Sequence, residues 1–261
     1  MEEVTDAPTP GPTFRPGYVL LAVVLVALVV GAYWMKTRQS TGPAPRTVAT
    51  PAAESTQSVL NRGIQAHNVG SLDAAMDLYH RVLQREPGNA AAHYNLGQIY
   101  NARRQYANAQ WEYEAALKVD PKSVNARLNL GVVLHAQRQF PAAAQAFQQV
   151  LELQPRHPQA LFDLGITLIE LGQPDQAVKW LKASLAEDSK PADPHYYLGV
   201  ALHRQKKLPE AKAALQEALA RNPRHVNAYR VLSRVYQEQG EQGLAQEALA
   251  KARELNPRLK Q

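Results

Sequence analysis

Histidines and carboxylates are the side chains of this sequence whose chemistry could serve catalysis or metal binding. The chain has eight histidines, and three of them, His67, His135 and His203, are evenly spaced along it. Packed helices lie about 8–10 Å apart, so histidines on alternate helix pairs would be roughly 20 Å apart, too far to share one metal ion. Acidic neighbours such as Glu112 and Glu114 fall in segments typical of solvated helices. These residues therefore predict neither a metal site nor a bound cofactor.

The sequence motifs of common enzyme classes are also missing. There is no glycine-rich phosphate-binding loop, no serine in a nucleophile elbow and no helix with a glutamate between two histidines. The chain has no cysteine, which excludes disulfides, thiolate metal sites and a cysteine nucleophile. The formal net charge is +6, but basic and acidic residues are mixed rather than gathered in runs, so we predict no nucleic-acid partner. We predict a protein that is not an enzyme.

A pattern with a period of 34 residues organises most of the chain. A Leu-Gly dipeptide or a close variant occurs six times, at Arg62-Gly63, Leu96-Gly97, Leu130-Gly131, Leu164-Gly165, Leu198-Gly199 and Leu232-Ser233. An alanine recurs in step with it, at Ala75, Ala109, Ala143, Ala177, Ala211 and Ala245. A fixed period of this length is typical of a stacked array, in which each unit buries its apolar face against its neighbours.

Each unit divides into two segments with helical periodicity. In the unit that begins at Ala90, apolar residues lie three or four positions apart in both halves, which places them on one face of each of two helices. Polar residues interrupt this pattern between the halves, and Pro121 ends the second helix because proline cannot continue it. The sequence therefore predicts an all-α fold of helix pairs separated by short turns.

This pattern resembles the tetratricopeptide repeat. The resemblance covers residues 56–259 without insertion or deletion, in the units 56–89, 90–123, 124–157, 158–191, 192–225 and 226–259. It implies a right-handed α-solenoid of six tetratricopeptide helix pairs, with the first helix of each pair on the concave side. It also implies that the small residue in the eighth place of each unit, glycine five times and Ser233 in the last, lets the two helices approach closely.

An apolar segment precedes the repeats. Residues 17–35 carry no charge, and as a helix they would span about 28 Å, close to the ~30 Å hydrocarbon thickness of a bilayer. Tyr18, Tyr33 and Trp34 lie at its ends, as aromatic residues do at the interfaces of a membrane. We predict a transmembrane helix here. The alternatives are a cleaved signal peptide, which acidic residues in the preceding tail disfavour, and a buried core helix.

The flanking segments define the rest of the predicted layout. Residues 1–16 form an N-terminal tail, and residues 36–55 form a flexible linker rich in Pro, Thr and Ala. Three basic residues follow the apolar segment and Arg15 alone precedes it, so the positive-inside rule favours cytoplasmic repeats. The prediction is a single-pass membrane protein with its repeats in the cytoplasm, and the opposite side of the membrane is the alternative.

A stripe along the first helices is the predicted binding surface. Its residues occupy the fifth, sixth, ninth and twelfth places of the units and are mostly apolar, aromatic or amide side chains. The predicted partner-binding residues are Tyr94, Asn95, Gln98, Asn101, Leu128, Asn129, Val132, Phe162, Ile166, Tyr196, Val200 and Arg230. The alternative is that several of them are partly buried between neighbouring first helices. The asparagines resemble the ladder in the repeat domain of O-linked N-acetylglucosamine transferases, but the row ends at Asp163.

These observations predict a membrane-anchored scaffold that binds a protein or peptide partner in its concave groove and recruits or assembles a complex. The membrane would be a second partner, through residues 17–35. The alternatives are a structural module that assembles with copies of itself into a homo-oligomer, and an accessory subunit of an envelope enzyme or biogenesis complex. The sequence does not choose among these functions, because function depends on sites rather than on the fold.

Overall fold

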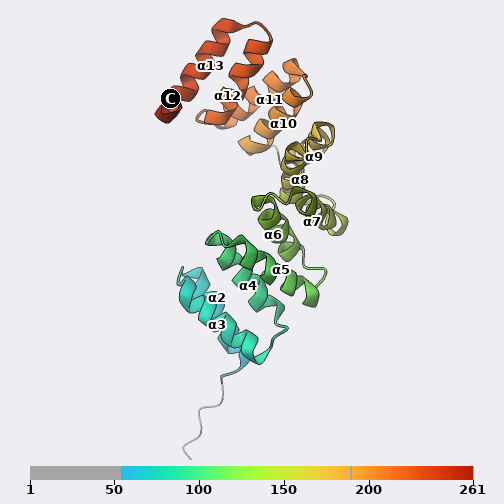
Figure 1. Cartoon of the computed structure of the whole chain (residues 1–261), viewed down its shortest axis with the longest axis vertical. Helices are drawn as coiled ribbons and strands as arrows, with labels where there is room; N and C mark the ends of the chain where they lie inside the picture. Colours follow the sequence, from blue (N-terminus) through green and yellow to red (C-terminus); the bar gives the residue numbers. More distant parts are fainter. Residues whose placement is uncertain (1–53, 189, 261) are drawn as a thin grey trace, which may run out of the picture. The chain divides into compact units, whose positions relative to one another are not determined.

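The computed structural model describes residues 54–188 and 190–260, with the side chains up to Leu259. Residues 1–53 lie outside the described part of the chain. The described part is entirely helical between its turns (Figure 1). The first helices of the successive pairs are α2 (Thr56–Asn68), α4 (Ala90–Ala102), α6 (Val124–Ala136), α8 (Pro158–Glu170), α10 (Ala192–Arg204) and α12 (Val226–Glu238).

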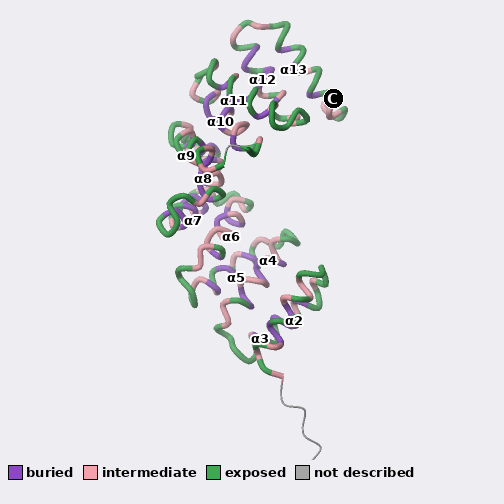
Figure 2. Tube along the Cα trace, turned by 180° about the vertical axis from the view of Figure 1, so that it is seen from behind, coloured by how far each residue is buried: buried purple, intermediate pink, exposed green. Residues whose placement is uncertain are grey.

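Each first helix is followed by a second helix of the same pair. The second helices are α3 (Leu72–Arg85), α5 (Tyr106–Val119), α7 (Phe140–Leu153), α9 (Pro174–Glu187), α11 (Leu208–Arg221) and α13 (Gln242–Leu255), and a short 3₁₀ helix, η1 (Pro257–Lys260), follows. Every second helix packs on its own first helix, and all of them except α13 also pack on the first helix of the next pair. Buried residues lie where these helices meet (Figure 2). This arrangement confirms the predicted all-α solenoid of six helix pairs.

Local sequence accounts for the helix ends. Five first helices begin after a residue whose side chain accepts a hydrogen bond from the backbone N–H three residues later, which satisfies one free donor of the first turn. These capping residues are Ser55, Asn89, Ser123, His157 and His225. The two histidines accept through Nδ1, at 3.3 Å from the nitrogen of Ala160 and 3.1 Å from that of Ala228. Two of the eight histidines therefore have a structural role.

The close approach inside each pair is made at the predicted small residue. A Cβ placed on Gly131 would lie 2.5 Å from the ring of Phe147, and one on Gly97 would lie 2.6 Å from the ring of Tyr113. The large side chain thus packs on the glycine of its own pair. In the last pair, Ser233 replaces glycine and is buried, and its hydroxyl donates to the carbonyl of Ala245 at 2.7 Å. The buried hydroxyl of the serine therefore has a hydrogen-bond partner.

A buried polar group lies between α4 and α5. His93 Nδ1 is 2.7 Å from a carboxylate oxygen of Glu112, and His93 Nε2 is 2.9 Å from the carbonyl of Pro87. A carbonyl only accepts, so Nε2 carries a proton, and a second proton is shared between Nδ1 and the carboxylate. Burial is the main reason that the pKa of Glu112 is raised. This group joins α4, α5 and the turn before α4, which gives His93 and Glu112 a structural role.

The beginning of the array differs from the sequence prediction. Glu54 and Ser55, the last residues of the predicted linker, belong to the first helix pair, since Ser55 caps α2 and the Glu54 carboxylate accepts from Arg62 at 3.0 Å. The carbonyl of Glu54 also accepts from Arg85 of α3 at 2.7 Å. The tail, the apolar segment and the rest of the linker lie outside the described residues.

The predicted localisation requires a correction. The described α-helices have 13 or 14 residues, which corresponds to about 20 Å, whereas crossing a bilayer requires about 30 Å of apolar helix. A search of the described residues finds no helix with the length and apolar character of a membrane span. This finding overturns the prediction of a single-pass membrane protein with cytoplasmic repeats. The predicted transmembrane helix at 17–35 lies outside the described residues, and no membrane anchor enters the function proposed below.

Candidate partner-binding surface

The predicted partner-binding residues lie on five first helices, α4 to α12. All are half-buried except Arg230, which is exposed, so each leaves part of its side chain accessible. Several also pack against the core, namely Leu128, Val132, Phe162, Tyr196 and Val200. These residues are therefore partly buried, as the alternative interpretation of the stripe expects, and they help to stabilise the array. Their role in binding stays a prediction.

Tyr94 brings together three of the predicted residues on α4 and α6. Its hydroxyl accepts a hydrogen bond from Gln98 at 3.1 Å and one from Asn129 of the next pair at 3.3 Å. Its ring also lies 6.0 Å from that of Tyr113. In contrast, Asn95 donates to the carbonyl of Ala91 in its own helix, at 2.8 Å. The asparagines therefore have different partners and do not present a uniform row of free amides.

Aromatic rings connect the first helices of the fourth, fifth and sixth pairs. Phe162 meets Tyr197 edge to face at 5.6 Å between ring centroids, and Tyr197 meets Tyr196 at 4.9 Å. Tyr196 then contacts the ring of His225 at 4.6 Å. Tyr197 and His225 were not among the predicted site residues. The sequence signal for Tyr197 is its sixth place in the unit, where the stripe has asparagine in the earlier units.

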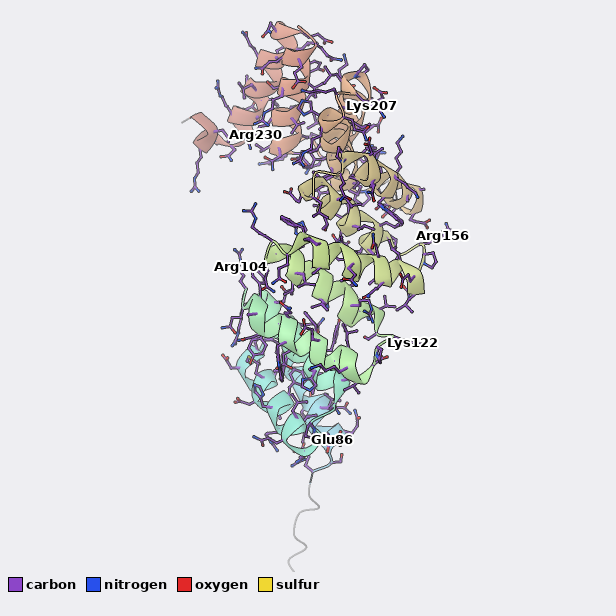
Figure 3. All side chains as sticks on the ribbon, turned by 45° about the vertical axis from the view of Figure 1, so that its right-hand side comes forward. Glu86, Arg104, Lys122, Arg156, Lys207 and Arg230 are labelled. Atoms are coloured by element: carbon purple, nitrogen blue, oxygen red, sulfur yellow. The ribbon has the colours of Figure 1, made fainter. Side chains whose placement is uncertain are left out.

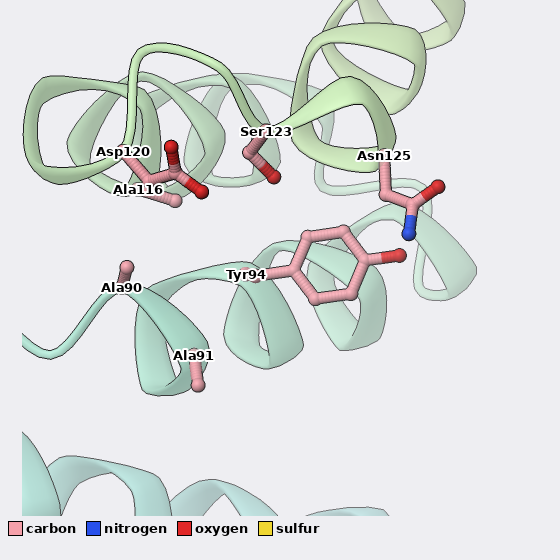
Figure 4. A pocket seen from close by; sticks show the side chains of 7 residues that line it. All are labelled: Ala90, Ala91, Tyr94, Ala116, Asp120, Ser123 and Asn125. Carbon is pink, nitrogen blue, oxygen red and sulfur yellow. The ribbon is translucent and has the colours of Figure 1, made fainter.

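Two equivalent cavities lie beside the aromatic residues of the fifth place. The first, about 280 Å³, contains Tyr94 and is bordered by Asp120, Ser123 and Asn125 (Figure 4). The second, about 350 Å³, is lined by the corresponding residues two pairs further along the chain, with Phe162 in place of Tyr94 and Asp188 in place of Asp120. In each cavity the aspartate accepts a hydrogen bond from a backbone N–H two residues later, so its position is fixed.

A third cavity lies among α6, α8 and α10 and contains two predicted residues, Val132 and Ile166. Its volume is about 140 Å³, and Phe147, His135, Asp163 and Tyr197 complete its walls. Asp163 Oδ1 accepts a hydrogen bond from Gln159 at 2.9 Å, whereas Asp163 Oδ2 and His135 Nε2 are buried without a partner. Burial raises the pKa of Asp163 to about 6 and lowers that of His135, since each charged form is poorly solvated.

Family models decide the relationship of this chain to known proteins. Models described as tetratricopeptide repeats match residues 69–110 and 134–201, residues 102–158 and residues 192–225. Together these matches cover more than half of the sequence. The chain belongs to the tetratricopeptide repeat family. No curated protein sequence matches it.

Solved structures agree with this assignment. PilF of Pseudomonas aeruginosa is similar, with a TM-score of 0.65 and 18% identity over 77% of this chain and 92% of that chain. A MamA fragment from Desulfovibrio magneticus RS-1 has a TM-score of 0.61 and 23% identity, over 64% of this chain and 95% of that chain. The tetratricopeptide protein YrrB has a TM-score of 0.59 and 20% identity, over 69% of this chain and 92% of that chain. At these identities the similarity establishes the fold alone.

The charges of the tetratricopeptide array are spread over several helix pairs. Figure 3 labels Arg104, Lys122, Arg156, Lys207 and Arg230, which lie apart from one another along the array. Within residues 54–188 and 190–260, no group of three histidine or acidic side chains is arranged to hold a metal ion. The features that distinguish the stripe are therefore its half-buried rings, its amides and the cavities between them.

Proposed function

We propose that this protein is a non-enzymatic scaffold that binds a peptide segment of a protein partner along the first helices of its tetratricopeptide array. The observation that carries the proposal is the set of half-buried rings at the fifth place of the second, fourth and fifth pairs, Tyr94, Phe162 and Tyr196, with open cavities beside the first two. Aromatic side chains next to a cavity provide a large apolar contact area for a peptide, and the tyrosine hydroxyls can also form hydrogen bonds. YrrB, which has the same fold, is described as a tetratricopeptide protein with an unusual peptide-binding site.

The test is the triple substitution of Tyr94, Phe162 and Tyr196 by alanine in the full-length chain. A peptide selected on the wild-type protein from a random library serves as the probe. Because aromatic anchors often contribute more than 1 kcal/mol each, we expect the triple variant to bind at least about 100-fold more weakly in calorimetry.

Trp111→Ala is the matched control, because Trp111 lies on the second helix α5 and is 60% exposed. This control should retain the wild-type affinity. Circular dichroism on all variants distinguishes loss of binding from loss of folding. Undiminished affinity in a folded triple variant would show that the peptide binds elsewhere, and the proposal would fail.

Self-association is the second candidate function. Leu244 lies on the last helix, α13, and is 43% exposed, which leaves apolar area at the end of the array that another copy could cover. If copies associate through this end, light scattering should show a mass that rises with protein concentration, and Leu244→Lys should remove that dependence. A constant monomer mass in the wild-type chain would exclude this candidate.

A further inference from the structure

The cavity among α6, α8 and α10 has both apolar and polar side chains in its walls. Val132, Ile166 and Phe147 form the apolar part, and Asp163, His135 and Tyr197 supply the polar groups. Its volume of about 140 Å³ is close to that of an engineered cavity that binds benzene, so it has room for one side chain of moderate size.

Two polar atoms of this cavity have no hydrogen-bond partner among the described residues. Asp163 Oδ2 and His135 Nε2 are buried and make no hydrogen bond, although both residues line the cavity and Asp163 Oδ1 accepts from Gln159. An unpaired buried polar atom costs about 1–3 kcal/mol, and a carboxylate costs more. Folding alone gives no reason to place a carboxylate here, since the sixth place holds asparagine in three units and valine in the last.

The charges around this cavity are negative. Asp163 lies on α8, which packs on α6, α7, α9 and α10. The charged groups that influence His135 of α6 and Tyr197 of α10 are Glu170 of α8, Asp193 of α10 and Asp163 itself, and all three are acidic. A cation placed in the cavity would therefore meet a favourable potential from several sides.

We propose that this cavity receives a lysine side chain of the bound peptide, whose ammonium donates to Asp163 Oδ2 and His135 Nε2 while its methylene stem lies against Val132 and Ile166. The inference rests on the proposed function. Lysine fits better than arginine because only one carboxylate oxygen is free, whereas guanidinium pairs best with both oxygens of a carboxylate. The ammonium is a compact charge with three donors, and its stem is apolar, so both parts of the side chain match the walls.

Binding of lysine is coupled to the protonation of Asp163. The carboxyl group, with a pKa of about 6 in the free protein, must be ionised to pair with an ammonium group, so lysine lowers that pKa and binding near pH 6 releases a proton. The affinity should be constant above about pH 7 and fall about tenfold by about pH 5, as the free carboxyl group becomes protonated. His135 opposes this pairing only if it becomes charged, and burial lowers its pKa.

The experiment selects peptides from a random library on the full-length chain at neutral pH. The best peptide is then synthesised with lysine and with norleucine, which has the same length but no ammonium group. We expect one invariant lysine among the selected sequences. Its replacement by norleucine should weaken binding about 30-fold to the wild-type protein but less than about threefold to Asp163→Asn.

Asp175→Asn is the matched control, because Asp175 is an exposed carboxylate on the second helix α9 and borders none of the three cavities. It should keep the full difference between lysine and norleucine. Carbon-13 NMR of the Asp163 carboxyl group supplies a second measurement, in which the lysine peptide should lower the pKa and the norleucine peptide should not.

Each outcome bears on a separate claim. Selected peptides without an invariant lysine, or the same loss from norleucine in Asp163→Asn as in the wild type, would overturn the lysine site and leave the peptide-binding function in place. An unchanged Asp163 pKa on addition of the lysine peptide would also overturn the site, since the cavity would then hold only water. Failure to enrich any peptide would overturn the proposed function and the lysine site together.

Discussion

Truncation of Phe147 to alanine is expected to lower the free energy of unfolding of the array by about 3–5 kcal/mol. Phe147 is only 1% exposed, and its ring packs on the backbone of Gly131 where α6 and α7 come closest. It also borders the cavity that contains Asp163. Removing the ring leaves a cavity that the two helices cannot close without losing their other contacts. The variant therefore loses the transfer free energy of the ring and is further destabilised by the cavity.

Urea unfolding followed by circular dichroism measures this loss, and Leu153→Ala provides the control. Leu153 lies on the same helix as Phe147 but is 42% exposed, so its truncation should cost less than about 1 kcal/mol. Because helix pairs interact only with their neighbours, the Phe147 variant should also unfold in a broader transition. A loss of less than about 1 kcal/mol for Phe147→Ala would mean that the contact between Gly131 and Phe147 does not hold the pair together.

Replacement of Asp163 by asparagine is expected to stabilise the protein by about 2–3 kcal/mol near pH 8. The pKa of this group rises from 3.8 to about 6 on folding because burial disfavours the carboxylate. A raised pKa means that the folded state binds the proton more tightly. The stabilisation from that proton is complete below about pH 4 and is lost as the pH rises through about 6, so the ionised form destabilises the fold at higher pH.

The measurement is the free energy of unfolding of both proteins from about pH 4 to about pH 8. The other titrating groups are the same in the two chains, so the difference between the curves isolates Asp163. That difference should be small near pH 4, grow through about pH 6 and then stay constant. Asp120→Asn should give a difference of less than about 0.5 kcal/mol. A flat difference for Asp163→Asn would show that the carboxyl group is solvated in the folded protein.

Taken together with the binding experiment, this result would separate the two roles of one residue. A substitution that stabilises the free protein and weakens the binding of a lysine peptide identifies a group retained for function at a cost in stability. Asparagine at position 163 keeps the size of the side chain and can still accept from Gln159, so packing does not explain the difference.

The fold could be predicted from the sequence because its determinants are local and repeated. Gly131 and Phe147 are close in sequence, and the contact between them recurs in other pairs, as between Gly97 and Tyr113. Their spacing in the sequence therefore predicts how the two helices of a pair pack against each other. The same holds for the proline and capping residues at the helix ends, which act within a few positions of the chain.

The candidate site was less predictable because it depends on contacts between pairs. The fifth-place residues Tyr94 and Phe162 do lie beside cavities, but the sequence did not indicate that the hydroxyl of Tyr94 is bonded to Asn129. The sequence interpretation treated Asp163 only as the end of a row of asparagines. The burial of its Oδ2 atom without a partner arises from three helices of successive pairs, and no spacing within one unit encodes it.

The contacts between helix pairs restrict how such a chain can change in length. Because α5 packs on both α4 and α6, and α7 on both α6 and α8, every junction along the array has the same construction. Deleting or duplicating one whole unit would rebuild an equivalent junction, whereas gaining or losing a few residues inside a helix would turn its apolar face away from both neighbours. Viable length variants of this protein should therefore differ by multiples of 34 residues, the period of the sequence.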